Sequence, residues 1–253
     1  MDNQGQQTID LQQFWHEAST ILERVVTSQA EAIRLAATFC AESLVNDGVL
    51  HAYGTGHSRA FAMELAGRAG GLVPVNRIDL ADLALYAGWP LERVTQDDIE
   101  RDLAAGEQLL SCYRIEPCDC FIISSQSGIN AAVVEVAQRI KAHGHALIAV
   151  TALDHTQQAT PRHPSGKKLY ELADVIIDSC SPFGDALLSL PNGGKACAIS
   201  SLSGALIGQM LTAEIINALL AKGIDPPVYI SYNVPGGIER GEQLRQQYLG
   251  RIR

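Results

Sequence analysis

The first fifth of the chain carries apolar residues at the spacing of amphipathic helices. The positions with helical spacing at its start are Leu11, Phe14, Trp15, Ile21, Leu22 and Val25. The alanine-rich stretch 30–44 also has one apolar face, and Asn46-Asp47-Gly48 follows it. Because glycine readily takes the left-handed conformation that ends a helix, the sequence predicts two N-terminal helices within residues 9–46.

Beyond residue 48, short apolar runs alternate with segments of helical period. The runs, each predicted as a strand, are 49–53, 72–78, 120–124, 146–151 and 174–178. The helical segments are 59–70, 97–112, 130–142 and 200–222. Short, mostly apolar strands that alternate with helices are typical of a parallel sheet covered on both faces, so the expected fold class is α/β. The longest irregular stretch, 152–168, is expected to be functional or mobile.

The composition permits a large core and narrows the range of ligands. Hydrophobic residues make up 47% of the 253 residues and aromatic residues only 6%, so aliphatic side chains must fill the core. The formal net charge of −9 argues against nonspecific binding of nucleic acid. It does not exclude a small anion, because backbone N–H groups at a helix N-terminus can hold one inside an acidic protein.

Several features point to the cytoplasm. No apolar run reaches the roughly 20 residues that span a bilayer. The polar start of the chain lacks the basic and apolar regions of a signal peptide. The six cysteines form no C-x-x-C pair, which favours reduced thiols. We therefore expect a cytoplasmic protein that makes no membrane contact.

Two predicted strand-to-helix turns, Gly54 to Ser58 and Ser124 to Gly128, are rich in glycine and hydroxyl side chains. In a parallel sheet, ligands bind at the carboxyl ends of the strands, near a topological switch point. Small residues let the backbone approach an oxyanion, and hydroxyls and helix N-termini supply donors and a favourable field. Neither turn has the Walker or the G-x-G-x-x-G pattern, so the two turns predict a site for a phosphate or a polyol rather than for a nucleotide.

Longer segments resemble the SIS (sugar isomerase) domains. They are GTGHSR (54–59), RAGGLVPVN (68–76), SQSG (125–128), PRHPSGKKLYELADVIID (161–178) and PPVYISYNVPGG (226–237). The likeness covers nearly the whole chain and is closest to stand-alone bacterial SIS proteins described as phosphosugar isomerases. It implies a three-layer αβα fold with a five-stranded parallel sheet of flavodoxin type, preceded by N-terminal helices, and ligand sites near the subunit interface of a dimer.

The expected organisation has three parts. Residues 1–48 form a helical segment, 49–223 the SIS domain that binds a phosphosugar, and 224–253 a tail that packs near the site. The apolar stripe of the first part (Phe14, Trp15, Leu22 and Val25) is expected to pack across a homodimer, which can pair again as a dimer of dimers. The expected partner is thus a phosphorylated sugar and a second copy of the chain, with no nucleic acid and no membrane.

The predicted substrate-binding residues are Gly54, Thr55, Gly56, Ser58, Arg59, Ser124, Ser125, Gln126, Ser127, Asn130, His155 and His163. Ser58, Ser125, Gln126 and Ser127 match phosphate or sugar contacts of the resembled family. Asn130 departs from the family loop, which has a phosphate-binding threonine in glucosamine-6-phosphate synthase. The two histidines follow the predicted strand 146–151 on the ligand side of the sheet.

Three residues are candidates for proton transfer in the catalytic step: His57, Glu64 and Glu214. Glu64 matches a catalytic carboxylate in the Glu-Leu-x-Gly-Arg segment of phosphoheptose isomerases, although it follows Gly54 by ten residues, several fewer than in those enzymes. Glu214 lies in an apolar helix, where a lone charge is costly unless it faces a cleft or a partner. No H-x-x-x-H or H-E-x-x-H spacing exists, so neither a metal nor a cofactor is expected.

These features leave three functions open. The leading one is an aldose–ketose isomerase of sugar phosphates, in which carboxylates and imidazoles move protons. The second is a lyase that resembles the N-acetylmuramic acid 6-phosphate etherases, whose glycine-rich loop is related to 54–59. The third is a phosphosugar sensor without catalysis. The residues before the first predicted strand are too few, and not basic enough, for the DNA-binding domain of SIS regulators.

Overall fold

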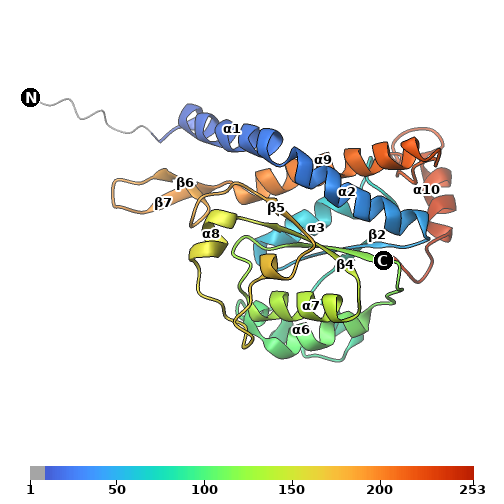
Figure 1. The fold of residues 1–253 in the computed structure, drawn as a ribbon, viewed down its shortest axis with the longest axis horizontal. Coiled ribbons are helices and arrows are strands. Elements are labelled where there is room, and N and C mark those ends of the chain that lie inside the picture. The colour runs from blue at the N-terminus through green and yellow to red at the C-terminus, as the bar shows by residue number, and fades with distance from the viewer. Residues whose placement is uncertain (1–8) are drawn as a thin grey trace, which may run out of the picture.

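The computed structural model of the chain describes residues 9–253 and contains the expected five-stranded parallel sheet (Figure 1). Its strands are β1 (Leu50–Gly54), β2 (Val75–Ile78), β3 (Cys120–Ser124), β4 (Ala146–Thr151) and β5 (Val175–Asp178). Their order is β2-β1-β3-β4-β5, so the chain passes from β1 to β2 on one side and then crosses to β3 on the other. Gly54 pairs with Ser124, which brings the carboxyl ends of β1 and β3 level.

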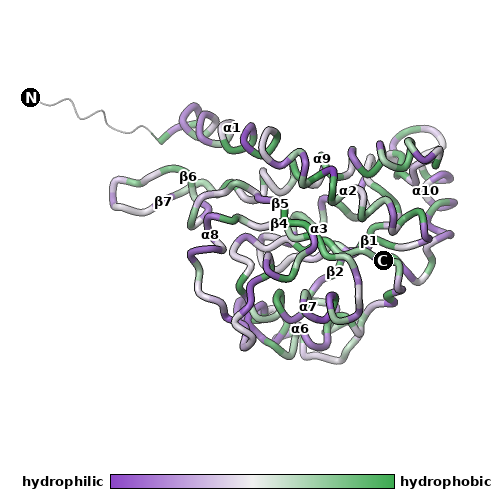
Figure 2. Tube along the Cα trace, viewed as in Figure 1, coloured by the Kyte–Doolittle hydropathy of each residue, from purple (hydrophilic) through white to green (hydrophobic). Residues whose placement is uncertain are grey.

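Helices cover both faces of the sheet, which confirms the three-layer αβα fold. One face packs against α1 (Leu11–Ser28), α2 (Ala30–Val45), α3 (Arg59–Leu65) and α9 (Ser200–Ala221). The other packs against α4 (Asp82–Tyr86), α5 (Leu91–Val94), α6 (Leu103–Leu109) and α7 (Ala131–Ala142). Leu50 and Ala52 belong to the first core and Tyr53 to the second, as the twofold period of a strand requires. Figure 2 shows the resulting hydrophobic band through the middle of the molecule.

Helix α1 projects from the body of the domain (Figure 1). Asp10 caps it, because its Oδ1 accepts hydrogen bonds from the N–H groups of Gln12 and Gln13, 3.0 and 2.9 Å away. Leu11 and Trp15 are 73% and 63% exposed. Residues 1–8 of the predicted N-terminal segment lie outside the described residues.

Several predicted elements differ in extent. The helix predicted for 59–70 ends at Leu65, because Ala66 is extended and Gly67 has a φ of +69°. The helix predicted for 97–112 is divided into the 3-10 helix η2 (Ile99–Arg101), α6 and the 3-10 helix η3 (Leu110–Cys112). Asp102 makes the break, since its side chain accepts from the N–H of Ala104 and starts α6 anew.

The stretch predicted as irregular holds a helix, and an unpredicted hairpin follows it. Helix α8 spans Leu153–Gln158, and the 3-10 helix η4 spans Leu169–Glu171. The strands β6 (Ala186–Ser189) and β7 (Lys195–Ala198) pair in antiparallel fashion and project beside α1 (Figure 1). The hairpin leads directly into α9, so its base lies at the end of the sheet where the ligand was expected.

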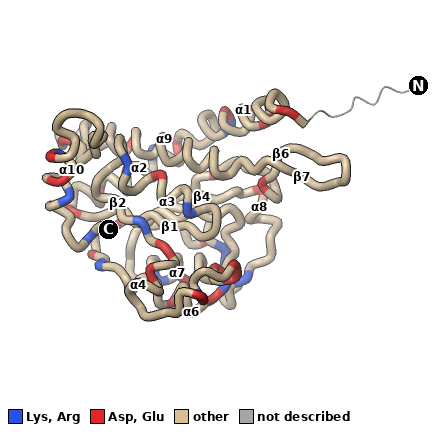
Figure 3. The backbone as a smooth tube through the Cα atoms, turned by 180° about the vertical axis from the view of Figure 1, so that it is seen from behind, with Lys and Arg blue, Asp and Glu red and all other residues tan. Residues whose placement is uncertain are grey.

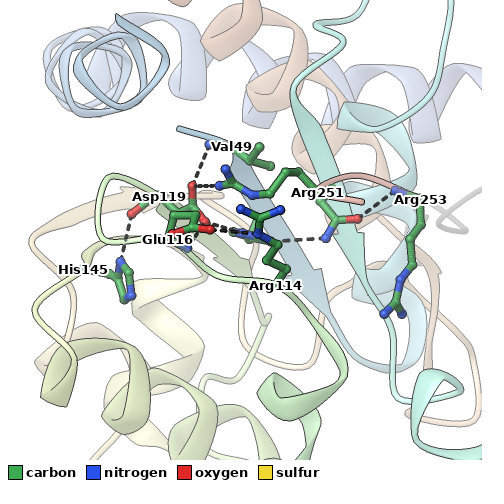
Figure 4. A network of polar contacts seen from close by, with 9 residues as sticks. Val49, Arg114, Glu116, Asp119, His145, Arg251 and Arg253 are labelled. Atoms are coloured by element: carbon green, nitrogen blue, oxygen red, sulfur yellow. Dashed lines mark hydrogen bonds and ion pairs between the residues drawn. The ribbon is translucent and has the colours of Figure 1, made fainter. Parts of the chain in front are cut away.

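The C-terminal part folds back onto the domain and contacts residues 70–71 and the amino-terminal end of β3. Tyr229 exchanges backbone hydrogen bonds with Gly70 and Gly71, and α10 (Gly237–Gln246) follows. The last residues reach the amino ends of β1 and β3, where Arg251 contacts Asp119 (Figure 4). Among the described helices, α9 alone is apolar and long enough to cross a membrane, by length and composition only. A core helix passes the same test, and α9 packs against α2 and α3.

Candidate functional site

A cleft of about 390 Å³ opens at the carboxyl ends of β1 and β3, the topological switch point of the sheet. It brings together nine of the residues predicted from the sequence: Thr55, Gly56, His57, Ser58, Ser125, Gln126, Ser127, Asn130 and His155. A smaller recess of about 20 Å³ shares part of this lining and adds Ser124. The cleft also contains residues that were not predicted: Glu100, Asp185, Ala198, Ser200 and Ser201.

The first wall is the turn from β1 into α3, whose backbone closes tightly. A Cβ atom on Gly54 would overlap the carbonyl group of Ser58, so only glycine fits there. Gly56 has a φ of +52°, and the N–H of Ser58 donates to the carbonyl of Thr55 over 3.0 Å. The 3-10 helix η1 (Gly56–Ser58) then presents His57 and Ser58 to the cleft.

The second wall is the turn from β3 into α7. Ser125 Oγ accepts a hydrogen bond from the N–H of Gly128 over 3.2 Å, which folds the serine-rich loop back on itself. The side chain of Gln126 accepts at Oε1 from Ser179 over 3.2 Å. Its Nε2 is buried without an acceptor among the described residues. An unmet buried donor is costly, so an oxygen atom of a ligand in the cleft would stabilise it.

Glu100 joins the two walls and was missed by the sequence analysis. Its Oε2 accepts from the Thr55 hydroxyl over 2.8 Å, and its Oε1 accepts from Asn130 Nδ2 over 2.7 Å. Arg162 in turn donates to Asn130 Oδ1 over 2.6 Å. Burial and then the charge of Glu100 raise the pKa of Tyr53, which lies at the end of β1 below the cleft. Glu100 lies on η2, which the sequence placed within one long helix.

The third wall is the start of α9, held by the base of the hairpin. Asp185 adopts a φ of +69° and accepts hydrogen bonds from Ser200 N–H (2.8 Å) and Ser200 Oγ (2.6 Å). It thereby caps α9 from outside the helix, with Ser201 beside it in the cleft. His155 on α8 accepts at Nδ1 from the N–H of Gly184 over 3.3 Å, so a neutral ring carries its proton on Nε2.

Other predicted residues lie away from the cleft within one chain. Glu64 pairs with Arg68 and accepts from Gln209 Nε2 over 2.7 Å, on the surface between α3 and α9. Glu214 lies 3.6 Å from Arg34, fourteen residues into α9, which places it roughly 20 Å along the helix from Ser200. Only a second copy of the chain could therefore bring either carboxylate to the cleft.

Arg59, His163 and the tail also have partners elsewhere. Arg59 donates to the buried Asp79 over 2.7 Å. His163 Nε2 lies 3.0 Å from Glu135 Oε2, which ties the 160s loop to α7. The tail meets Asp119, which precedes β3, whereas the cleft follows β3. Within one chain, the end of the tail therefore lies at the amino ends of the strands, opposite the cleft, and the packing of residues 224–253 near the site stays a prediction.

The electrostatics of the cleft are unusual for an anion site. Its lining carries the carboxylates of Glu100 and Asp185 and the imidazoles of His57 and His155. Among residues 9–253, no lysine or arginine lines it. An anion there would be held by serine hydroxyls, by the Gln126 amide and by N–H groups at the starts of α7 and α9. The same part of the chain contains no cluster of three His, Cys, Asp or Glu able to hold a metal ion.

Comparisons with known proteins agree with this geometry. The family described as "SIS domain" matches residues 13–152. A UPF0309 protein of Listeria monocytogenes is 40% identical over 240 residues, which cover 94% of this chain and 97% of that protein.

Solved structures show the same fold at low sequence identity. A phosphoheptose isomerase from Neisseria gonorrhoeae has a TM-score of 0.51 at 20% identity, covering 79% of this chain and 94% of that one. The NanR protein of Vibrio vulnificus, complexed with ManNAc-6P, has a TM-score of 0.50 at 13% identity, covering 96% of this chain and 70% of that one.

Proposed function

This chain belongs to the SIS domain family, and from that premise we propose that its cleft binds a sugar phosphate and interconverts the aldose and ketose forms. The observation that carries the proposal is the meeting of two serine- and glycine-rich turns with the start of α9 around Glu100 and His57. Donors suited to a phosphate and groups suited to proton transfer thus line one cavity. The isomerase and the ManNAc-6P complex among the structural neighbours agree with a sugar phosphate as the ligand.

The phosphate is placed against Ser125, Ser127 and Ser201, where hydroxyls and the N-termini of α7 and α9 supply donors. The sugar then extends toward Glu100, on the side of the first turn. In the open-chain aldose, one group removes the proton from C2 and returns it to C1. A second group moves a proton from O2 to O1, so the enediol collapses to the ketose with no net change in atoms.

Glu100 and His57 are the groups that can perform these transfers within one chain. Both line the cleft, and His57 is exposed to solvent from which it can exchange protons. The roles predicted for Glu64 and Glu214 require that a second copy presents them to this cleft. His155, with Nε2 protonated in its neutral form, is a donor for a sugar hydroxyl.

A sensor is the second candidate, and one contact favours it. Both carboxylate oxygens of Glu100 are already occupied by donors, from Thr55 and Asn130. A carboxylate held in this way fixes the two walls of the cleft and can still accept a hydrogen bond from a ligand. These contacts are sufficient for binding and do not require proton transfer. Among the structural neighbours, the ManNAc-6P complex of NanR agrees with this alternative.

Proton NMR in D₂O separates the two functions. The chain is incubated with aldose and ketose phosphates of five to seven carbons and with amino-sugar phosphates. The C2 proton of the aldoses and the C1 protons of the ketoses are followed. Loss of either signal by exchange with D₂O, or formation of the other isomer, supports the isomerase. Glu100→Gln is expected to abolish the exchange while thermal shifts still report binding. Thermal stabilisation by one sugar phosphate, without any exchange in the unaltered chain, would support the sensor and rule out isomerisation of that ligand.

A further inference from the structure

A second cavity, of about 420 Å³, shares no residue with the cleft. Its walls come from the segments 68–76 and 226–237, which the sequence analysis singled out and which the proposed reaction does not use. The two segments run side by side: Gly70 N–H donates to the Tyr229 carbonyl over 2.8 Å, and Tyr229 N–H donates to the Gly71 carbonyl over 2.9 Å. The cavity is therefore a built feature of the fold and not a gap between loose loops.

The charges that line this cavity are positive. Arg68 and Arg245 both line it, and no aspartate or glutamate does so among the described residues. Within residues 9–253, Arg245 has no carboxylate at ion-pair distance, although the chain carries a net charge of −9. Arg68 is paired with Glu64. Figure 3 shows basic segments near the C-terminus and both basic and acidic segments along α10, whereas acidic segments predominate near α6 and α7.

Neutral donors complete the lining. Ser231, Tyr232 and Asn233 follow one another along one wall, and Tyr229 lies beside them. Burial raises the pKa of Tyr229, and the charge of Arg245 acts against this rise, as expected when the guanidinium lies near the phenol. Arg253 also lines the cavity, but its guanidinium stacks on Tyr86, 3.6 Å from the ring centroid, and is already engaged.

Close packing holds this wall in place before any ligand arrives. A Cβ atom on Gly237 would overlap the carbonyl of Ser231, and one on Gly241 would lie 2.9 Å from the ring of Tyr232. The segment 231–237 therefore lies flat against α10, whose next turn carries Arg245. A site that is fixed in advance loses little conformational entropy on binding.

We propose that this arginine cavity, defined by Arg68, Tyr229, Ser231, Asn233 and Arg245, binds a small metabolite that carries a phosphate or carboxylate group. The planar guanidinium of Arg245 offers paired donors that match such an oxyanion, and the hydroxyl and amide groups of the wall fix its orientation. The volume lies within the roughly 300–1,000 Å³ typical of small-molecule sites. The inference does not depend on isomerase chemistry in the cleft.

Isothermal titration with inorganic phosphate, and separately with malonate, tests the cavity and separates the two oxyanion classes. The titrations use the full chain carrying Ser125→Ala and Ser127→Ala, so that the cleft does not contribute. Adding Arg245→Gln is expected to weaken binding about 10- to 100-fold, the loss typical of a hydrogen bond to a charged group. Asn233→Ala is expected to weaken it less. Arg240→Gln, on the same helix but paired with Asp225, is the matched control and should bind unchanged.

A gain of binding gives an independent readout. Glu64→Gln releases Arg68 from its ion pair, so phosphate affinity is expected to rise about two- to five-fold, the value of an exposed pair. Equal affinity in the Arg245→Gln and Arg240→Gln variants would overturn the inference. So would the loss of all binding in the cleft variant alone, because phosphate would then bind only in the cleft. Since the readout is heat of binding, a failed isomerase assay leaves this result standing.

Discussion

Replacement of Arg251 by glutamine is expected to destabilise the fold by about 3 kcal/mol, because it removes the counter-ion of a buried carboxylate. Asp119 is 2% exposed and accepts four hydrogen bonds (Figure 4). Val49 N–H and Arg251 Nη2 donate to Oδ1 over 2.8 and 2.6 Å. Glu116 N–H and His51 Nε2 donate to Oδ2 over 2.7 and 3.1 Å.

The magnitude follows from the charges of this cluster. Asn76 Nδ2 lies 3.3 Å from His51 Nδ1, and His51 Nε2 faces Asp119, so the imidazole is held between an amide and the carboxylate. Among the described lysines and arginines, Arg251 alone lies at ion-pair distance from Asp119, with 2.6 Å between Nη2 and Oδ1. Breaking a buried pair costs about 3–5 kcal/mol, and the three remaining hydrogen bonds favour the lower value. For a chain of this size, about 3 kcal/mol corresponds to a fall of roughly 6–12 °C in Tm.

The pH dependence has a definite sign. Burial alone would raise the pKa of Asp119, but hydrogen bonds from His51, Glu116 and Val49 outweigh it and hold this pKa below its usual value. The charged carboxylate therefore stabilises the fold above the unfolded pKa of roughly 3.9, and this stability is lost as the pH falls through the lower folded pKa. The difference in the free energy of unfolding between the unaltered chain and the Arg251→Gln variant should be complete at neutral pH and shrink below about pH 4.

Urea unfolding of the unaltered chain and of the Arg251→Gln variant, at neutral and at acidic pH, measures this difference. The matched control is Arg240→Gln, which breaks an ion pair of 2.8 Å with Asp225, a side chain that is 82% exposed. That change is expected to cost less than about 1 kcal/mol at any pH. Equal losses in the two variants, or a loss in Arg251→Gln that does not depend on pH, would show that the buried charge is not what stabilises this edge of the sheet.

Three further changes test the site and the assembly. Gly54→Ala is expected to cost more than about 2 kcal/mol in urea unfolding and to abolish sugar-phosphate binding, because its Cβ would overlap the Ser58 carbonyl. Asp185→Ala removes the cap of α9, so unfolding should become easier by about 1–2 kcal/mol, and a stability within 0.3 kcal/mol of the unaltered chain would contradict the capping role. Sedimentation at micromolar concentration is expected to show a dimer that Trp15→Ser weakens at least about ten-fold, since this 63%-exposed side chain lies on the predicted contact; a monomer before substitution would refute that contact.

The fold was predictable because local signals and global packing agree. The five strands are short apolar runs. Four predicted runs contain the strand that forms, as in β3 at 120–124, and the run 49–53 is displaced by one residue from β1 at Leu50–Gly54. The alternation of apolar runs and helical segments also located the two turns, because each turn follows the carboxyl end of a strand. Those strands, β1 and β3, are neighbours at the switch point of the sheet. The hairpin was missed although Asn192-Gly193-Gly194 is a turn signal, because the strands beside it lack a regular alternation of apolar and polar residues.

The polar centre of the cleft could not be predicted in the same way. Glu100 meets Thr55 across 45 residues of sequence, and no local pattern reports such a contact. The charged positions around it, from Asp97 to Asp102, have the composition of an exposed helix. Conversely, the likeness to a family motif pointed to Glu64. In the structure this side chain lies near the end of α3 and contacts Arg68 and Gln209 outside the cleft. Sequence patterns located the walls of the site, and tertiary packing decided which carboxylate stands between them.

The absence of lysine and arginine from the cleft lining in residues 9–253 has a consequence for how binding responds to salt. Hydroxyl and N–H donors act at contact distance, where dissolved ions do not screen them, whereas the net charge of −9 repels a sugar phosphate over a longer range. Between about 0.05 and 0.5 M NaCl, the affinity of the cleft is therefore expected to stay constant or to rise slightly, as the repulsion is screened. Phosphate binding in the arginine cavity should weaken over the same range, because Arg245 is exposed. A fall of more than about ten-fold in cleft affinity would mean that cations hold the phosphate, and these would have to come from a second copy of the chain.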